Sequence, residues 1–393
     1  MLIYLRRIKL FLLVNVILAL TLNIFIPVTS FGASPASPLE TTAESAVLME
    51  PFSGQVLLAK EKDKELPMAS VTKLMSLLVA LKAIEEGRLK LNDIVIASEN
   101  AWEMGGSQIY LEPGEEFTLE EILIAVAVGS ANDASVALAE QIAGSEEAFV
   151  QIMNQKAKEL GLKHTHFVNC TGLPAKEHYT SAYDLALILR ECLKYPLFIK
   201  YSSIYEYDLR GGQFKLWNTN KLLKWYPGTD AGKTGWTEEA KYCLASTVTK
   251  DGLRLIAVVL GTPEPRSHFR ESIKLYQYGF ARYKAIYLAQ QGEKVKRLPI
   301  SKGNQDYMEI ITKEPVCLVV LKGEENKNFK THLDLPTWIV APVKKGQVIG
   351  TYIVMDKEGK KVLRVPLIAQ NQVEKASVLR QVNKTLSRLY NFN

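Results

Sequence analysis

The order in which strand-forming and helix-forming segments follow one another constrains the fold of this chain more than any other feature. Two short strands are predicted at residues 45–49 and 55–60, and four helices follow before residue 165. Strands return at 242–249 and 253–260. Helices that bury one face need a sheet to pack on, so we expect the first and last strands to share one antiparallel sheet. The pattern therefore predicts an α+β domain.

Apolar spacing and capping residues indicate where the helices begin and end. Apolar side chains recur at helical spacing from Ser70 as far as Gly87, which supplies a stop. Thr118 and Glu121 form a capping box at the start of the second helix. Two further helices are predicted at residues 134–142 and 146–160.

The last quarter of the chain has a different character. From about residue 297 to residue 368 the sequence contains only strand and turn signals, which predict a small all-β domain. We therefore divide the 393 residues into four expected parts. They are a signal segment (1–32), an α+β domain (33–288), an all-β domain (289–369) and an amphipathic helix (370–393).

The N-terminal segment is typical of a secretory signal. Three cations, Arg6, Arg7 and Lys9, precede an apolar run at residues 10–28, and small residues follow it. Cleavage after Gly32 fits the small-x-small rule, and an uncleaved membrane anchor is the alternative. We therefore expect the protein to be exported.

Charge argues against a nucleic-acid partner. The formal net charge is +6, and removing the signal segment with its three cations lowers it to about +3. That positive surplus is too small to indicate a basic surface that binds nucleic acid, so we expect no nucleic acid among the partners.

Cysteine and histidine usage predicts neither a metal nor a disulfide framework. The four cysteines could pair in three ways, but an exported domain with an adequate core does not need such bonds. We favour buried free thiols. No Cys/His spacing matches a zinc site, so we expect no metal and no cofactor. The residues concerned are Cys170, Cys192, Cys243, Cys317, His164, His166, His178, His268 and His332.

The C-terminal segment has the pattern of an amphipathic helix. On a helical wheel its apolar side chains cover roughly 120°, and basic side chains lie on another face. Such a helix can lie on an anionic membrane surface, and packing on its own β domain is the alternative. The apolar residues are Val378, Leu379, Val382, Leu386, Leu389 and Tyr390, and the basic ones are Arg380, Lys384 and Arg388.

Three short patterns could carry chemistry. They are Ser70-Val71-Thr72-Lys73, Ser130-Ala131-Asn132 and Lys233-Thr234-Gly235. A chain of this length should contain roughly one or two matches to each of the first two patterns by chance, but only about 0.1 matches to Lys-Thr-Gly. The order and surroundings of the three patterns are therefore stronger evidence for a functional site than any one pattern alone.

The first pattern suggests an activated serine. Three residues apart at a helix start, Ser70 and Lys73 share a face, so the lysine amine can reach the serine hydroxyl. The positive potential of the helix N-terminus disfavours a protonated Lys73, and a lysine of lowered pKa can act as the base that activates serine. The alternative is a capping serine beside a solvated lysine.

The second pattern has an internal comparison. Ser98-Glu99-Asn100 also matches Ser-x-Asn, but it lies in a polar stretch, whereas Ser130-Ala131-Asn132 interrupts two apolar helices. Polar groups in such a break need partners or a cleft. We therefore take Ser130 and Asn132 as the functional pair.

The third pattern precedes a predicted strand. Gly235 would allow a substrate backbone to approach that strand closely, while Lys233 and Thr234 offer a cation and a hydroxyl to an anionic end group. The alternative is an exposed turn.

Together the three patterns resemble the penicillin-binding and serine β-lactamase fold superfamily. The match is most similar to the low-molecular-mass D-alanyl-D-alanine carboxypeptidases and extends over nearly the whole chain after the signal. Many relatives have Pro at Cys170, and some have His at Trp236 and Arg at Thr219. The runs that carry the resemblance are residues 66–75, 166–173, 178–184, 232–237 and 341–346.

The resemblance implies a β-lactamase/transpeptidase-like catalytic domain with defined roles. Ser70 would be the nucleophile and Lys73 its general base, and Ser130 with Lys233 would pass the proton to the leaving D-alanine. Asn132 would hold the substrate amide, and Thr234 with Lys233 the terminal carboxylate. The backbone N–H groups of Ser70 and Trp236, the residue after Gly235, would form the oxyanion hole.

The implied activity is removal of the last D-alanine from peptidoglycan stem peptides ending in D-Ala-D-Ala, through an acyl-enzyme on Ser70, at the extracytoplasmic face of a bacterial membrane or in the cell wall. β-Lactam antibiotics would acylate the same serine. A β-lactamase is one alternative. Class A enzymes of that kind need a glutamate in a Glu-x-x-Leu-Asn motif, and the nearest match here, at residues 159–163, has Lys163 in place of the Asn. A cell-wall sensor that is acylated without turnover is another alternative. Endopeptidase activity is a closer variant.

Overall fold

The computed structural model describes residues 40–324, 329–378 and 380–382. The predicted signal segment lies outside these residues, as do residues 379 and 383–393 of the predicted terminal helix. No helix within the described parts of the chain combines the length and apolar character needed to span a bilayer.

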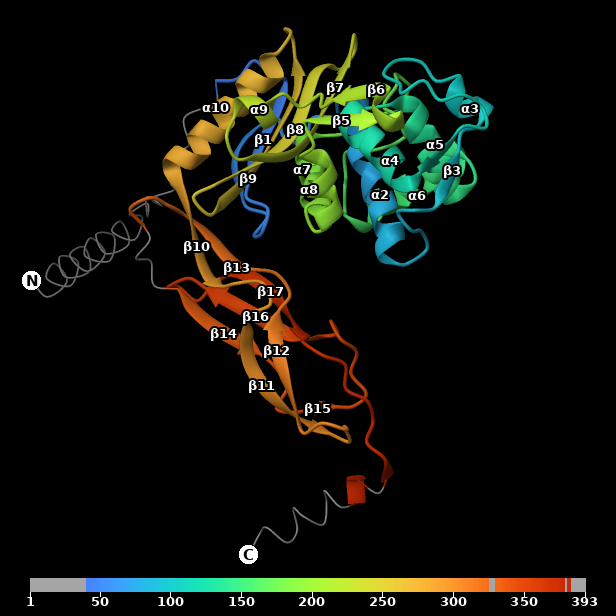
Figure 1. The fold of residues 1–393 in the computed structure, drawn as a ribbon. Helices are drawn as coiled ribbons and strands as arrows, with labels where there is room; N and C mark the ends of the chain where they lie inside the picture. The colour runs from blue at the N-terminus through green and yellow to red at the C-terminus, as the bar shows by residue number, and fades with distance from the viewer. Residues whose placement is uncertain (1–39, 325–328, 379, 383–393) are drawn as a thin grey trace, which may run out of the picture. The chain divides into compact units, whose positions relative to one another are not determined.

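A five-stranded antiparallel sheet forms the centre of the catalytic domain (Figure 1). Its order is β2-β1-β9-β8-β7, and Val47 of β1 pairs with Val258 of β9. The first and last predicted strands therefore share one sheet, which confirms the predicted α+β class. The strands are β1 (Ser45–Met49), β2 (Val56–Lys60), β7 (Thr229–Thr237), β8 (Lys241–Lys250) and β9 (Leu253–Thr262).

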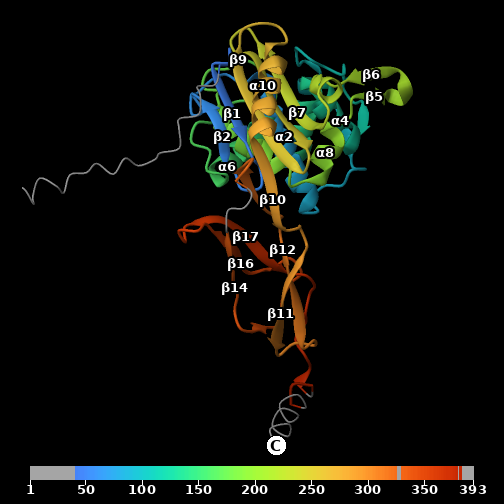
Figure 2. The ribbon, with the colours of Figure 1, turned by 90° about the vertical axis from the view of Figure 1, so that its left-hand side faces the viewer.

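Helices cover both faces of this sheet, which explains the continuous apolar runs in β8 and β9. Ser246 and Leu255 face α10 (Ser267–Arg282), where Tyr276 bonds Ser246 at 2.8 Å and Gly279 lies against Leu255. Their neighbours Ala245 and Ile256 join the core on the opposite face. Figure 2, turned by 90°, shows α10 lying across the strands.

The remaining helices and hairpins complete this domain. Thr118 and Glu121 form the predicted capping box of α4, and Ser145 caps α6. The helices are α2 (Lys73–Glu85), α3 (Glu99–Trp102), α4 (Leu119–Ile124), α5 (Asn132–Ala143), α6 (Glu146–Glu159), α7 (Ala182–Cys192), α8 (Pro196–Ser202), α9 (Leu222–Trp225) and α10 (Ser267–Arg282). The hairpins pair β3 (Ile94–Ile96) with β4 (Glu116–Thr118), and β5 (Glu206–Leu209) with β6 (Phe214–Trp217) around the short turn η3 (Arg210–Gly212).

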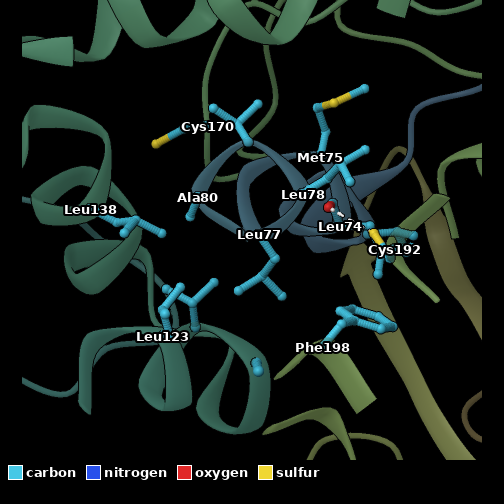
Figure 3. Close-up of a cluster of buried hydrophobic side chains, with 14 of the residues drawn as sticks. Leu74, Met75, Leu77, Leu78, Ala80, Leu123, Leu138, Cys170, Cys192 and Phe198 are labelled. Carbon is cyan, nitrogen blue, oxygen red and sulfur yellow. Dashed lines mark hydrogen bonds between the residues drawn. The ribbon is translucent and has the colours of Figure 1, made fainter. Parts of the chain in front are cut away.

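Helix α2 lies at the centre of the core and is buried on nearly all sides. Leu74, Leu77 and Leu78 are at most 3% exposed and pack among side chains from α4, α5, α7 and α8 (Figure 3). A helix enclosed in this way has its position fixed by packing. The residue at its N-terminus, Lys73, is therefore held rigidly.

All four cysteines are free and buried, as the sequence predicts. Two of them, Cys170 and Cys192, pack around α2 in the same core (Figure 3). Burial raises the pKa of both thiols, so they behave as small apolar side chains.

The C-terminal part is all-β, as the sequence predicts, but its bounds differ from the predicted 289–369. Strand β10 already begins at Tyr283, and Val373, inside the predicted terminal helix, pairs with Val343 and belongs to the apolar core. A six-stranded sheet has the order β14-β16-β17-β12-β11-β15, and β10 pairs separately with β13. Two apolar clusters form its interior, one around Ile310 and Leu367 and one around Val354 and Val365. The strands are β10 (Tyr283–Ala289), β11 (Lys294–Ser301), β12 (Tyr307–Thr312), β13 (Val316–Leu321), β14 (Lys330–Asp334), β15 (Ile339–Val340), β16 (Val348–Met355) and β17 (Lys361–Ala369).

Candidate active site

Ser70 lies in a 3₁₀ turn, η1 (Ala69–Thr72), immediately before α2. The sequence predicts an α-helix from Ser70 itself. The structure differs because Ala69 has a left-handed φ of 49° and Val71 bonds back to Met68 through an i→i−3 hydrogen bond. The tight turn places the Ser70 hydroxyl at the edge of a cleft while Lys73 begins the helix behind it.

The Lys73 ammonium group lies in a fully buried polar pocket. Its Nζ donates to Ser70 Oγ at 3.1 Å, to Asn132 Oδ1 at 2.6 Å and to the Thr171 carbonyl at 2.5 Å. Burial lowers the pKa of Lys73 to about 7, while the charge of Asp133 acts in the opposite direction. The sequence argument attributes such a shift to the helix N-terminus, but desolvation is the main cause here.

Ser130 follows a break in the helical chain that the sequence indicates at Gly129. After α4 the backbone widens into a π-helical turn, η2 (Ala125–Gly129), and Ser130 takes a left-handed φ of 61°. Strained backbone of this kind is typical of functional sites. The Oγ of Ser130 accepts a hydrogen bond from Lys233 Nζ at 2.7 Å.

Lys233 joins Ser130 to strand β7. It is 1% exposed and also donates to the carbonyl of Thr234 at 3.0 Å. Burial and the nearby charge of Lys73 lower its pKa well below the ordinary lysine value. An amine whose pKa is lowered in this way can exchange a proton with the Ser130 hydroxyl.

Asn132 is held by contacts on both sides of its amide. Its Oδ1 accepts from Lys73, and its Nδ2 donates to the carbonyl of Gly105 at 2.6 Å. The next residue, Asp133, accepts bonds from the backbone N–H groups of Ile109 and Leu111 and so fixes the loop that faces Asn132. The sequence argument does not single out Asp133, although an acidic residue at a predicted helix start in an apolar stretch is a usable signal.

Gly235 allows strand β7 to lie directly against the serine turn. A Cβ at this position would be 2.7 Å from the Met68 carbonyl oxygen and 3.0 Å from the Ser70 backbone nitrogen. From the sequence, Gly235 is expected to let a substrate backbone approach the strand closely. In the structure, the backbone that lies close to Gly235 is the protein's own. Trp236 consequently follows at the cleft edge, 55% exposed.

The predicted residues meet at one cleft of about 450 Å³. Ser70, Ser130, Thr234, Gly235 and Trp236 line it, and Lys73, Asn132 and Lys233 support it from behind through the hydrogen bonds given above. All eight site residues that the sequence predicts are thus brought together. The remaining lining residues are Ser107, Thr219, Lys221, Trp225, Tyr242, Arg266, His268 and Phe269.

A buried histidine supports the serine turn, a contact that the sequence argument misses. The Val168 N–H donates to His178 Nδ1 at 3.0 Å, so Nε2 carries the ring proton and donates to Thr72 Oγ1 at 2.8 Å. The Thr72 hydroxyl then donates to the Ala69 carbonyl at 2.8 Å. This chain of hydrogen bonds holds the left-handed residue that precedes Ser70.

Two weaker sequence matches, Ser98 for the Ser-x-Asn pattern and Glu159 for the β-lactamase motif, lie away from the cleft. Ser98 caps the short helix α3 by accepting from the Ala101 N–H at 3.0 Å. Glu159 ends α6, and its partly exposed carboxylate lies 3.5 Å from Lys82 and 3.6 Å from Lys156. Neither residue lines the cleft. Among the described residues, no cluster of three or more His, Cys, Asp or Glu side chains could hold a metal ion.

Comparison with known protein families agrees with this geometry. A family model described as D-alanyl-D-alanine carboxypeptidase matches residues 32–264, and one described as the C-terminal domain of penicillin-binding protein 5 matches residues 283–375. The chain belongs to the D-alanyl-D-alanine carboxypeptidase family. It is therefore a serine peptidase of the penicillin-binding type by sequence family as well as by fold.

Individual relatives are similar over most of the chain. The D-alanyl-D-alanine carboxypeptidase DacF of Bacillus subtilis is 43% identical over 353 residues, which are 89% of this chain and 90% of that protein. Penicillin-binding protein 5 of Haemophilus influenzae superposes with a TM-score of 0.68 at 31% identity, covering 86% of this chain and all of that one. Penicillin-binding protein D2 of Listeria monocytogenes, in its ampicillin-bound form, gives a TM-score of 0.57 at 28% identity, covering 62% and 100%.

Proposed function

We propose that the protein removes the terminal D-alanine from peptidoglycan stem peptides ending in D-Ala-D-Ala, through an acyl-enzyme on Ser70. The observation that carries this proposal is the contact between Lys73 Nζ and Ser70 Oγ at 3.1 Å, made by a buried lysine whose pKa is about 7. A lysine with that pKa is partly unprotonated at neutral pH and can accept the serine proton.

Acylation then proceeds with each proton and bond accounted for. Unprotonated Lys73 takes the Ser70 proton as Oγ attacks the carbonyl carbon of the penultimate D-alanine, and the oxyanion lies near the backbone N–H groups of Ser70 and Trp236. The C–N bond breaks when the nitrogen of the leaving D-alanine receives the proton of Ser130. Ser130, bonded to Lys233 at 2.7 Å, regains a proton from the Lys73 ammonium, so Lys73 ends the acylation step unprotonated.

Water releases the acyl group in the second step. Lys73 is placed to take a proton from a water molecule that attacks the ester, since its Nζ bonds both Ser70 Oγ and Asn132 Oδ1. The Asn132 amide, held by Gly105, is suited to orient the substrate backbone. Thr234 at the cleft wall is the proposed hydroxyl for the substrate carboxylate.

Penicillins fit the same chemistry, because the strained lactam carbonyl is attacked as the peptide carbonyl is. The ampicillin-bound relative from Listeria monocytogenes supports this proposal. A β-lactamase is disfavoured because the nearest Glu-x-x-Leu-Asn match, at Glu159, is engaged by Lys82 and Lys156 at a helix end. The penicilloyl ester on Ser70 is therefore expected to persist.

The N- and C-terminal segments suggest where the reaction takes place. We propose export by the N-terminal segment, whose cations and apolar run have the layout of a secretory signal. Docking of the terminal amphipathic helix on an anionic membrane would then hold the enzyme close to new peptidoglycan. Peptidoglycan stems and β-lactams are the partners that this proposal implies.

A timed assay tests the activity. Diacetyl-L-Lys-D-Ala-D-Ala should release free D-alanine continuously and in large molar excess over enzyme, and Ser70→Ala should release none. A single stoichiometric acylation without further D-alanine would instead identify a sensor. Rapid hydrolysis of penicillin with no D-alanine release would identify a β-lactamase.

A further inference from the structure

One edge of the C-terminal sheet exposes apolar side chains. Strand β15 is the edge strand of the six-stranded sheet, and its Val340 pairs with Ser301 at the end of β11. Ile339 belongs to the apolar core, so its neighbours Trp338 and Val340 point the other way, where they are 60% and 51% exposed. Folded proteins usually protect a sheet edge, so exposed apolar side chains there are typical of a contact surface.

The same end of the domain is rich in basic side chains. We call it the domain tip and define it as residues 301–307, 336–347, 371–378 and 380–382. The N–H groups of Ala341 and Ala376 donate to the carbonyls of Ser301 and Lys302 and so join these segments (Figure 1). Cations outnumber carboxylates here. The exposed cations of the tip are Lys302, Lys344, Lys345, Lys375 and Arg380, and the exposed acids are Asp306 and Glu374.

The terminal segment leaves the domain from this tip. Val373 pairs with Val343 before the chain becomes helical at Val378. Val378 and Val382 are 78% and 51% exposed, and four residues apart they lie on one helical face. The start of the predicted amphipathic helix therefore belongs to the same tip as Trp338.

An anionic lipid surface matches both features of the tip. Tryptophan is enriched at the boundary between headgroups and acyl chains, and lysines near an anionic bilayer are attracted to it. A soluble anionic polymer would satisfy the lysines but would leave Trp338 and Val340 in water. The combination of an exposed apolar edge with surrounding cations therefore favours a bilayer.

We propose that the domain tip docks on an anionic phospholipid bilayer, with Trp338 at the headgroup boundary and Lys344 and Lys345 against the phosphate groups. This inference rests on the proposed membrane location and adds a second contact, made by the folded domain itself, to that of the terminal helix. Two linked contacts bind more tightly than either alone and restrict how the domain is oriented on the membrane.

Vesicles of phosphatidylglycerol test the basic part of the surface, using the chain from residue 33 on, its expected exported form. Lys344→Gln/Lys345→Gln should bind these vesicles about 10- to 30-fold more weakly than wild type. Salt screens the attraction and phosphatidylcholine carries no net charge, so the difference should disappear at high salt and on phosphatidylcholine vesicles.

Lys360→Gln/Lys361→Gln is the matched control. Both lysines are exposed, and Lys361 begins β17, whose other end, Ala369, adjoins the tip at Gly346. The control removes the same charge from the opposite end of that strand, so it should bind as wild type does. Equal losses in the two double variants would overturn the inference, because net charge alone would then explain binding.

Trp338→Ala tests the apolar part. It should weaken binding about 5- to 10-fold, whereas Trp102→Ala should have no effect, since Trp102 is similarly exposed, at 54%, but lies in α3 of the catalytic domain. Phosphatidylglycerol brominated in its acyl chains should quench part of the wild-type tryptophan fluorescence. The other tryptophans, at positions 102, 217, 225 and 236, belong to the catalytic domain, so the quenching should vanish in Trp338→Ala. Quenching that persists in this variant would contradict the inference.

A cell-wall polymer is the competing partner. Purified cell wall should bind the wild type and the Lys344→Gln/Lys345→Gln variant equally. Binding to cell wall but not to vesicles, lost in that variant, would assign the tip to a wall polymer and overturn the membrane proposal.

Release of D-alanine separates this inference from the proposed activity. None of the substituted residues lines the catalytic cleft, so every variant should hydrolyse soluble diacetyl-L-Lys-D-Ala-D-Ala at the wild-type rate, which also shows that it is folded. A wild type that binds vesicles but releases no D-alanine would refute the activity and leave the tip assignment standing. A wild type that releases D-alanine but does not bind vesicles would refute the membrane location and, with it, this inference.

Discussion

At the scale of single residues, the chemistry depends on how far burial lowers the pKa values of two lysines, Lys73 and Lys233. An ordinary lysine with a pKa near 10.5 is unprotonated in only about one molecule in 3,000 at pH 7. Lys73, with a pKa of about 7, is unprotonated in about half. That difference accounts for the ability of a lysine to act as a base in this cleft.

The rate of Ser70 acylation should therefore depend on pH through Lys73. Because the base must be unprotonated, the rate constant should rise from pH 5 to pH 9 with a midpoint near 7. Penicillin labelling measured at a series of pH values gives this profile. Lys73→Arg should remove activity at every pH, since guanidinium stays charged. A flat profile in the wild type would exclude Lys73 as the base.

Several site residues could be predicted from the sequence because their chemistry is expressed in short patterns. Ser70 with Lys73 shares a helical turn, and Ser130 lies at a visible break after Gly129. His178 could not be found in this way. Its role arises from a contact with Thr72, which lies 106 positions away in the sequence, and no local pattern encodes such a pair.

At the scale of elements, the site depends on backbone segments that lie unusually close together. Gly172 has a φ of 88°, and a Cβ there would lie 2.0 Å from the Ala69 carbonyl oxygen. Gly235 approaches the same turn from strand β7. Two glycines thus allow separate segments to enclose the serine turn. The order of strands and helices predicts the sheet, but this close approach depends on tertiary packing.

Gly172→Ala should destabilise the protein and slow acylation. Gly144→Ala is a matched control, because Gly144 has a similar φ of 82° but has nothing within 4 Å of the added Cβ. The control should cost about 1–2 kcal/mol, the penalty of a left-handed residue. Gly172→Ala should lower the free energy of unfolding by about 2 kcal/mol or more beyond the control, because the Ala69 carbonyl must move to admit the Cβ. Denaturant unfolding of both variants measures the difference. Equal losses of stability would show that crowding against the Ala69 carbonyl does not contribute.

At the scale of the whole molecule, two buried histidines link folding to pH. Burial lowers the pKa values of His178 and His268 from 6.5 to about 4. Between these values the unfolded chain binds more protons than the folded one, so stability falls as the pH falls. Each histidine contributes about 3 kcal/mol that is present above pH 6.5 and lost as the pH approaches 4.

The free energy of unfolding should therefore decrease steeply between pH 6.5 and pH 4. His178→Gln keeps an N–H donor for Thr72 but does not titrate, so its unfolding free energy should depend less on pH over this interval. Denaturant titrations at several pH values measure both slopes. Identical slopes in wild type and variant would contradict the contribution of His178.

The architecture of the described chain could be predicted from the sequence at low resolution. Periodicity separates the helical part from the all-β part, because helices and strands bury side chains with different periods. It does not give the order of strands within a sheet. In the C-terminal sheet, for example, β11 lies between β12 and the distant β15, an order that follows from packing rather than from neighbouring residues.

The central claim is that Ser70 is the nucleophile of an acyl transfer activated by Lys73. The most direct measurement is labelling with a fluorescent penicillin, followed by mass spectrometry of the digested protein. The wild type should carry one penicilloyl group on the peptide that contains Ser70, and Ser70→Ala should carry none. A labelled alanine variant, or an adduct on another residue, would contradict the account.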